Sequence, residues 1–281
     1  MGEIAALFTR RPYVVAFLLA FAILAWSERG VWRGFLWLVT GTTIGWLSEA
    51  CSVRTGFPFG HYVYHREQFA SELWLGPVPL FASLSFAFVS YFAFSAACQL
   101  LAPRNDEPSR AARSAEGALR TALLAAVIGT WMDTVIDPLT LIGAHWFLGD
   151  LYHYDPPGPH FGVPVVNYGG WLVTIGAIAI ANQMLDRVQA RRGQLARGPA
   201  LPLQHLWGLG CCFGVFAFML AINVWLLARH TAPPDVPVGQ ILASGLLSFT
   251  LFVLFVAIVT RNRPVRAPRL ADTVDAGVSY S

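Results

Sequence analysis

The 281-residue chain contains no lysine, because all 19 of its basic residues are arginine. A retinal Schiff base forms on a lysine amine, so a seven-helix retinal pigment is excluded. Charged residues of either sign are also scarce, at 12% of the chain, whereas 56% of the residues are hydrophobic. With a mean hydropathy of +0.54, this composition is typical of an integral membrane protein, and the net charge of +3 gives no reason to expect a nucleic-acid partner.

Cysteine is rare as well, and its positions show no metal-binding spacing. The chain has four cysteines, of which Cys211 and Cys212 are adjacent inside an apolar run and would point to different helix faces. We therefore expect these side chains to be small buried hydrophobic residues rather than metal ligands.

Seven apolar windows are long enough to form membrane helices. They cover roughly residues 13–26, 33–48, 78–101, 118–141, 164–185, 205–228 and 238–260. The first could be a signal peptide, but Leu24-Ala25-Trp26-Ser27 is a poor cleavage site, so we expect an uncleaved helix. The sequence predicts an all-α, polytopic membrane bundle formed by residues 1–263 as one domain, with a disordered tail at 264–281.

The distribution of arginine predicts how the helices are oriented. With seven spans, 14 arginines fall on one side of the membrane and 5 on the other. Arginine-rich segments stay in the cytoplasm, so we expect a bacterial inner-membrane protein with a cytoplasmic C-terminus. The loops at 50–77 and 142–163 would then lie outside the cytoplasm.

Two acidic residues, Asp133 and Asp137, lie inside the apolar run from Leu119 to Ile142. A charged carboxylate near the bilayer centre costs roughly 3 kcal/mol, so such a residue is a candidate for function. The four-residue spacing puts both side chains on one helix face, and two acids that close do not easily both ionise. The pair predicts a proton donor in an apolar site; the other interpretation is a structural polar cluster that joins helices.

Other polar and aromatic residues are expected near this pair. Glu49 ends the second predicted helix and Asn167 begins the fifth, so both lie at the same side of the membrane as the two aspartates. We expect Glu49 to join the acid pair in catalysis. The residues that we expect to bind a substrate are Trp46, His61, Tyr62, Tyr64, Trp146, Asn167 and Trp171. Aromatic rings stabilise a desolvated cation by about 2 kcal/mol each.

The two loops at this side of the membrane resemble each other. Gly60-His61-Tyr62-Val63-Tyr64 leads to a Pro and a helix, as does Gly149-Asp150-Leu151-Tyr152-His153-Tyr154, and each follows a helix that ends in acid. Either the chain contains a parallel internal repeat, which would bring both acidic ends to one cavity, or Gly/Pro/Tyr loops are alike by chance.

Two short motifs suggest other chemistry. His61-x-x-x-His65 has a spacing used by membrane di-iron oxygenases, but the chain has only seven scattered histidines, and the residues between these two look extended. Asp133-x-x-x-Asp137 is similar to the magnesium–diphosphate motif of membrane prenyltransferases, but a second Asp-rich motif and basic phosphate clamps are missing. We expect no metal and no cofactor, and a prenyltransferase is the alternative enzyme.

Taken together, these motifs resemble the bacterial and archaeal membrane family of carotenoid biosynthesis proteins. The resemblance covers roughly residues 35–185. It rests on Gly45-x-x-x-Glu49, Thr55-Gly56-Phe57-Pro58-Phe59-Gly60-x-Tyr62-x-Tyr64, Gly76-Pro77-Val78-Pro79, Asp133-x-x-x-Asp137-Pro138 and Phe161-Gly162-Val163-Pro164-x-x-Asn167-Tyr168-x-Gly170-Trp171.

This family includes the gamma-carotene 1',2'-hydratase and the bisanhydrobacterioruberin hydratase. The resemblance therefore implies addition of water to the terminal C1'–C2' double bond of an acyclic carotenoid, without a cofactor. One of Asp133 and Asp137 would protonate the alkene, Glu49 would help to keep the proton poised, and Asn167 with His61 or Tyr62 would hold the water. A non-catalytic carotenoid-binding protein is the second alternative, although it would not need three acids.

Overall fold

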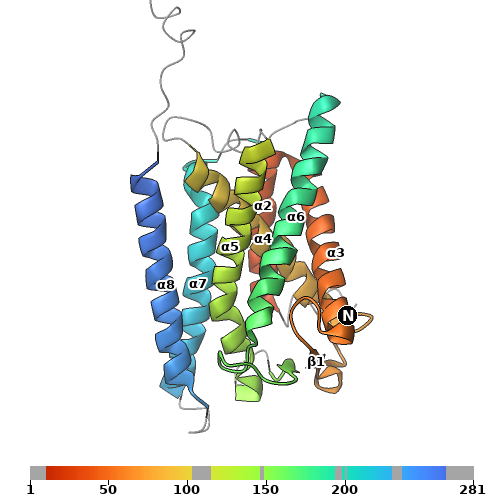
Figure 1. Ribbon diagram of the computed structural model, residues 1–281, viewed down its shortest axis with the longest axis vertical. Coiled ribbons are helices and arrows are strands. Elements are labelled where there is room, and N and C mark those ends of the chain that lie inside the picture. The colour runs from red at the N-terminus through yellow and green to blue at the C-terminus, as the bar shows by residue number, and fades with distance from the viewer. Residues whose placement is uncertain are drawn as a thin grey trace, which may run out of the picture.

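The computed structural model describes residues 11–102, 115–145, 149–193, 198–199, 201–229 and 236–263. The expected tail at 264–281 and Trp146 lie outside these residues. Seven long helices account for most of the described chain (Figure 1). They are α2 (Pro12–Arg29), α3 (Val31–Thr55), α4 (Leu80–Leu101), α5 (Ala115–Thr140), α6 (Val165–Arg191), α7 (Gln204–Arg229) and α8 (Val238–Arg261). Each corresponds to one predicted window, so the all-α fold is confirmed.

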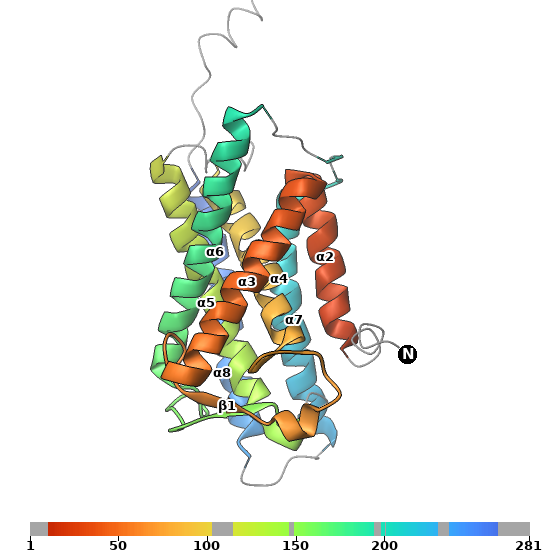
Figure 2. The same ribbon diagram turned by 90° about the vertical axis from the view of Figure 1, so that its right-hand side faces the viewer.

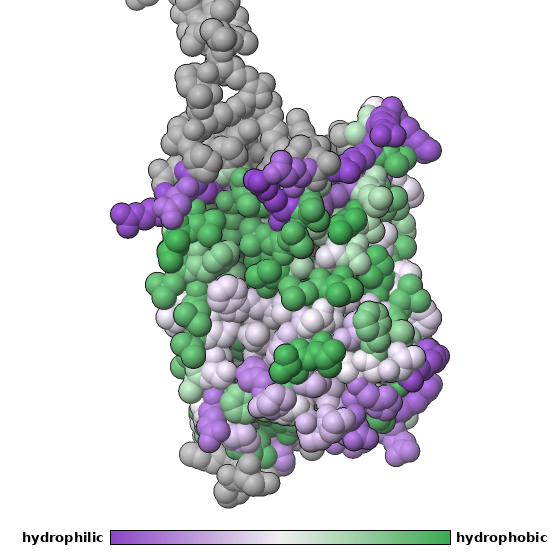
Figure 3. Space-filling view, in the orientation of Figure 1, coloured by the Kyte–Doolittle hydropathy of each residue, from purple (hydrophilic) through white to green (hydrophobic). Residues whose placement is uncertain are grey.

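Six of these helices, all except α3, are long and apolar enough to cross a membrane, counted over the described residues. Helix α3 is more polar but has 25 residues, which span about 37 Å, enough for a hydrocarbon core of roughly 30 Å. On the face shown in Figure 3, strongly apolar residues gather in the upper half, residues of intermediate hydropathy lie below them, and hydrophilic residues are found at both ends. The chain is an integral membrane protein.

Helix α4 is the central helix of the bundle. In its most apolar window 78% of the residues are buried, compared with 17% for α8 at the edge. Because α4 is apolar on every side, it can be surrounded by other helices, and α2, α3, α5 and α7 all pack against it (Figures 1 and 2).

Two segments far apart in the sequence pair at one end of the bundle. Strand β1 (Tyr62–Tyr64) is antiparallel to β4 (Tyr152–Tyr154), with Tyr62 opposite Tyr154, Val63 opposite His153 and Tyr64 opposite Tyr152. The 3-10 helices η1 (Arg66–Phe69) and η3 (Gly143–His145) and the small hairpin of β2 (Trp74–Leu75) and β3 (Val78–Pro79) lie in the same two loops. The extended segment inferred between His61 and His65 is therefore confirmed.

The β1–β4 pairing is symmetric about the Val63–His153 pair, as expected if α3–β1–α4 and α5–β4–α6 are two copies of one unit. Counted from Pro79 and Pro164, Phe86 on α4 and Trp171 on α6 occupy the same position. Their rings stack on each other with centroids 4.7 Å apart. These observations favour the internal repeat over a chance likeness of the loops.

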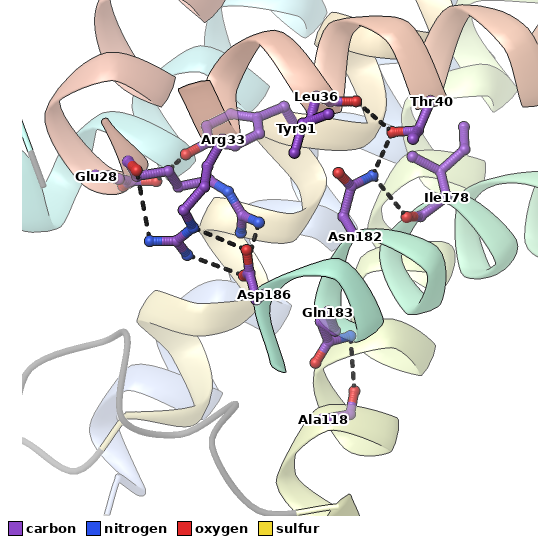
Figure 4. Close-up of polar contacts among 11 residues, drawn as sticks. Glu28, Arg33, Leu36, Thr40, Tyr91, Ala118, Ile178, Asn182, Gln183 and Asp186 are labelled. Carbon is purple, nitrogen blue, oxygen red and sulfur yellow. Dashed lines mark hydrogen bonds and ion pairs between the residues drawn. The ribbon is translucent and has the colours of Figure 1, made fainter. Parts of the chain in front are cut away.

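A buried ionic cluster fixes the helices at the opposite end of the bundle (Figure 4). Asp186 on α6 accepts hydrogen bonds from Arg29 at 2.7 Å and from Arg33 at 2.8 Å. The hydroxyl of Tyr91 on α4 donates to Glu28 on α2 at 2.9 Å. Since buried charges are costly unless they are paired, these contacts hold α2, α3, α4 and α6 in a fixed arrangement there.

The orientation inferred from arginine predicts that the end with β1 and β4 faces away from the cytoplasm. Topology reporters fused after Arg113 and Arg192 are therefore expected to report a cytoplasmic location, because both positions belong to the arginine-rich side. A periplasmic signal from both fusions would reverse the orientation, without changing which residues meet at the β1–β4 end.

Candidate functional site

A cavity of about 150 Å³ lies among the helices near β1 and β4. Two carboxyl groups line it, those of Glu49 on α3 and Asp137 on α5. Most of the remaining wall is apolar or aromatic. It includes Phe59, Tyr62, Tyr64, Phe81, Phe86, Phe88, Tyr152, Tyr154, Asn167, Trp171 and Phe218. The cavity thus combines acidic groups with surroundings that suit a lipophilic molecule.

Asp137 lies in the last turns of α5 and has three hydrogen-bond donors. The hydroxyl groups of Tyr152 and Tyr154 donate to it at 2.8 and 3.0 Å, and the Asn167 amide donates at 2.9 Å. Successive side chains of a strand point to opposite faces, so Tyr152 and Tyr154 can reach the same carboxyl group while His153 points away. The pairing of β4 with β1 thus determines the surroundings of Asp137.

Asp133 lies one turn earlier on α5 and is fully buried. The Asn167 amide donates to its Oδ2 at 2.7 Å and so joins the two aspartates. The same Asn167 nitrogen therefore holds the two carboxyl groups close together, and Oδ1 of Asp133 has no hydrogen-bond partner among the described residues. Two carboxyl groups this close do not easily both ionise, so the arrangement favours a proton on one of the two acids.

Glu49 forms a second acid–tyrosine pair in the first half of the repeat. The Tyr64 hydroxyl donates to it at 2.7 Å, and the Ser83 hydroxyl at the start of α4 donates at 3.2 Å. Tyr64 in β1 corresponds to Tyr154 in β4, so each half supplies its own acid with a tyrosine hydroxyl. Glu49 is buried, with 6% of its surface exposed.

Four tyrosines of β1 and β4 form a cluster beside these acids. Their ring centroids lie 5.4 to 5.7 Å apart. Burial raises the pKa of Tyr64 and of Tyr154 well above the usual range, and the charges of Glu49 and Asp137 raise these pKa values further. The phenols therefore stay neutral at physiological pH and act as hydrogen-bond donors to the carboxyl groups.

The structure brings most of the predicted site residues together. Glu49, Tyr62, Tyr64, Asp137, Asn167 and Trp171 line the cavity, and Asp133 lies directly behind Asp137. Among the other predicted residues that the structure describes, Trp46 and His61 do not line it. Trp46 donates its indole N–H to the Leu75 carbonyl at 2.8 Å, and His61 is exposed. His61 directly precedes Tyr62 in extended chain, so the two side chains point to opposite faces.

Sequence reasoning missed Tyr152, Tyr154 and Ser83 as partners of the acids. The Tyr-x-Tyr pattern shared by the two loops could have indicated the tyrosines, since alternation in a strand puts both hydroxyls on one side. Nothing in the sequence around Ser83 sets it apart from the other serines of α4.

The histidine motif at His61 and His65 is arranged differently from a metal centre. His65 contacts His153 at 2.6 Å and Asp150 at 2.9 Å on the outer side of the β1–β4 pair. Over the described ranges, no group of three or more His, Cys, Asp or Glu side chains is placed to hold a metal ion.

The fold and the cavity define the class of protein: an integral membrane helical bundle with an apolar cavity that has carboxyl groups at one end. A family model for carotenoid biosynthesis proteins matches residues 10–234, and the chain belongs to this family. The match includes α2 and α7, so it extends well beyond the range 35–185 inferred from the motifs. No curated protein and no solved structure matches the chain.

Proposed function

We propose that the protein is a carotenoid hydratase, which adds water across the terminal C1'–C2' double bond of an acyclic carotenoid end group. The observation that carries this proposal is the buried pair of Asp133 and Asp137, which the Asn167 amide bridges and which presents Asp137 to an apolar cavity. An apolar site disfavours the ionised form of a carboxylic acid, so such an acid keeps its proton near neutral pH and is available as a general acid.

The reaction runs in two steps. Asp137 transfers its proton to C2', so the π bond breaks, a C–H bond forms and C1' becomes a tertiary cation. Water then adds to C1' to form the C–O bond, and its surplus proton passes to the carboxylate pair. Between turnovers Asp133 and Asp137 share one proton. The pair therefore has the same protonation state at the end of the cycle as at the start.

The cavity wall contributes charge stabilisation and a place for the water. The stacked rings of Trp171 and Phe86 belong to this wall and stabilise the cation, which has no water shell. The Asn167 amide is already committed to the two aspartates, and His61 is exposed. The water is therefore assigned to Tyr62 and Glu49, which face the cavity from the first half of the repeat.

The product of the reaction tests this proposal. Co-expression with enzymes that make an acyclic carotenoid is expected to give a product heavier by one water. The same conversion in isolated membranes is expected to continue in the presence of a chelator and without nicotinamide, flavin or oxygen, because hydration is neutral in redox terms.

A rate lost with chelator and restored by magnesium or iron would support a prenyltransferase or a di-iron enzyme. An unchanged carotenoid that co-purifies with the protein would support a non-catalytic binder.

A further inference from the structure

The cavity is much smaller than a carotenoid. At about 150 Å³ it matches a cavity that accommodates a benzene-sized molecule. It can therefore hold the terminal isoprenoid unit that reacts, while the long polyene must extend out of it. The part of the cavity wall that lies away from the acids therefore determines where the polyene leaves the cavity. This inference rests on the proposed function.

We propose that the polyene leaves the cavity sideways into the bilayer between α2 and α7. Tyr13 and Phe17 of α2 and Phe218 of α7 line the cavity, and all three side chains are partly exposed. The Phe218 ring stacks on Tyr13 and meets Phe17 edge to face, with centroids 5.6 Å apart in both cases. We call these three residues the α2–α7 portal.

Two other helix pairs around the cavity, α3–α4 and α5–α6, are tightly packed. Gly45 of α3 leaves no room for a Cβ against the Phe86 ring of α4, and Gly41 meets Ala87 in the same way. Gly129 of α5 lies equally close to Ile175 of α6. At Gly41 the neighbouring atom is the Cα of Ala87, so opening a path there would require separating α3 from α4. The portal instead is closed by aromatic side chains, which can change rotamer without moving the backbone.

The end of the portal nearest the β1–β4 loops is closed by an ion pair. Arg11, next to the first residue of α2, contacts Glu72 at 2.9 Å and lies 4.4 Å from the centre of the Phe81 ring. This contact ties the beginning of α2 to the loop and to α4, so the polyene is directed into the bilayer rather than into water. The Phe17 ring of the portal also stacks on the Phe88 ring of α4, with ring centroids 5.5 Å apart. The two rings offer an aromatic surface to a conjugated chain.

A reversible cross-link across the portal tests this path. The double variant Tyr13→Cys/Phe218→Cys, in a background with the four native cysteines replaced, is treated with a short bis-methanethiosulfonate linker that dithiothreitol removes. The control is Phe213→Cys/Phe249→Cys, which bridges α7 and α8 where the two rings lie 6.0 Å apart and neither lines the cavity. Each variant is compared with itself before and after cross-linking.

Two readouts are needed: the rate of hydration, and the amount of acyclic carotenoid taken up from vesicles, measured by its visible absorption on the purified protein. The portal cross-link is expected to abolish most uptake and most hydration, both restored by dithiothreitol, whereas the control cross-link leaves them in place. Unchanged uptake after complete portal cross-linking, or an equal loss in the control, would overturn the α2–α7 path. Uptake that is blocked by the portal cross-link in a protein that never hydrates the carotenoid would support the path and contradict the hydratase.

Discussion

The variant Asp137→Asn is expected to lose at least about a hundredfold in hydration rate, in line with the usual contribution of a general acid. Asparagine keeps the size of the side chain, and its carbonyl oxygen can still accept a hydrogen bond from Tyr152 or Tyr154. It cannot transfer a proton to carbon. The rate is measured in membranes and divided by the amount of inserted protein, so that chemistry is separated from folding.

Asp133→Asn is expected to lose most of the activity as well, although Asp133 does not line the cavity. It removes the partner with which Asp137 shares a proton, so Asp137 would be left with its three hydrogen-bond donors and would favour the ionised form. The matched control is Asp186→Asn, which changes a partly buried aspartate at the opposite end of the bundle. This control is expected to lower the yield of folded protein and to retain its rate per molecule. Normal hydration by both the Asp133 and the Asp137 variants would make the pair structural.

Glu49→Gln is expected to cause a smaller effect than either aspartate variant, a loss of about tenfold, which corresponds to roughly 1.4 kcal/mol of transition-state stabilisation. Glutamine can still accept the hydrogen bonds of Tyr64 and Ser83, so the cavity keeps its shape. What disappears is the carboxyl group that helps to hold the water and to stabilise the positive charge. The measurement is the same normalised rate, with the carotenoid at a saturating level.

The comparison between the two acids decides their roles. Ser83→Ala, which removes only one hydrogen bond of Glu49, should reduce the rate less than Glu49→Gln. A loss in Glu49→Gln that exceeds the loss in Asp137→Asn would make Glu49 the proton donor, and the two halves of the repeat would exchange their roles.

The sequence was sufficient for the helices and for the acids within them. Each helix is built from local apolar residues, and a carboxyl group inside such a run stands out because of its energetic cost. The four-residue spacing of Asp133 and Asp137 also predicted one helix face correctly, since that depends only on helix geometry. Asn167 was expected at the same depth because it begins the helix that returns from the same end.

The direction of side chains in the loops was harder to predict. His61, Tyr62 and Trp46 looked equivalent in the sequence, yet only Tyr62 lines the cavity. That choice depends on the pairing of β1 with β4, because the pairing determines which face of each strand meets the acids. A single strand read alone shows the alternation of its side chains but not which face is turned inward.

The sequence by itself determined that this chain is a helical membrane protein with acids buried near one end of its bundle. Hydrophobicity and helix periodicity are local properties, and they are read directly from neighbouring residues. Only the tertiary structure decided that Asp137 and Glu49 share one cavity, that Asp133 lies behind it, and that α2 and α7 close it with rings. Those facts depend on contacts between segments far apart in the chain, which no local pattern specifies.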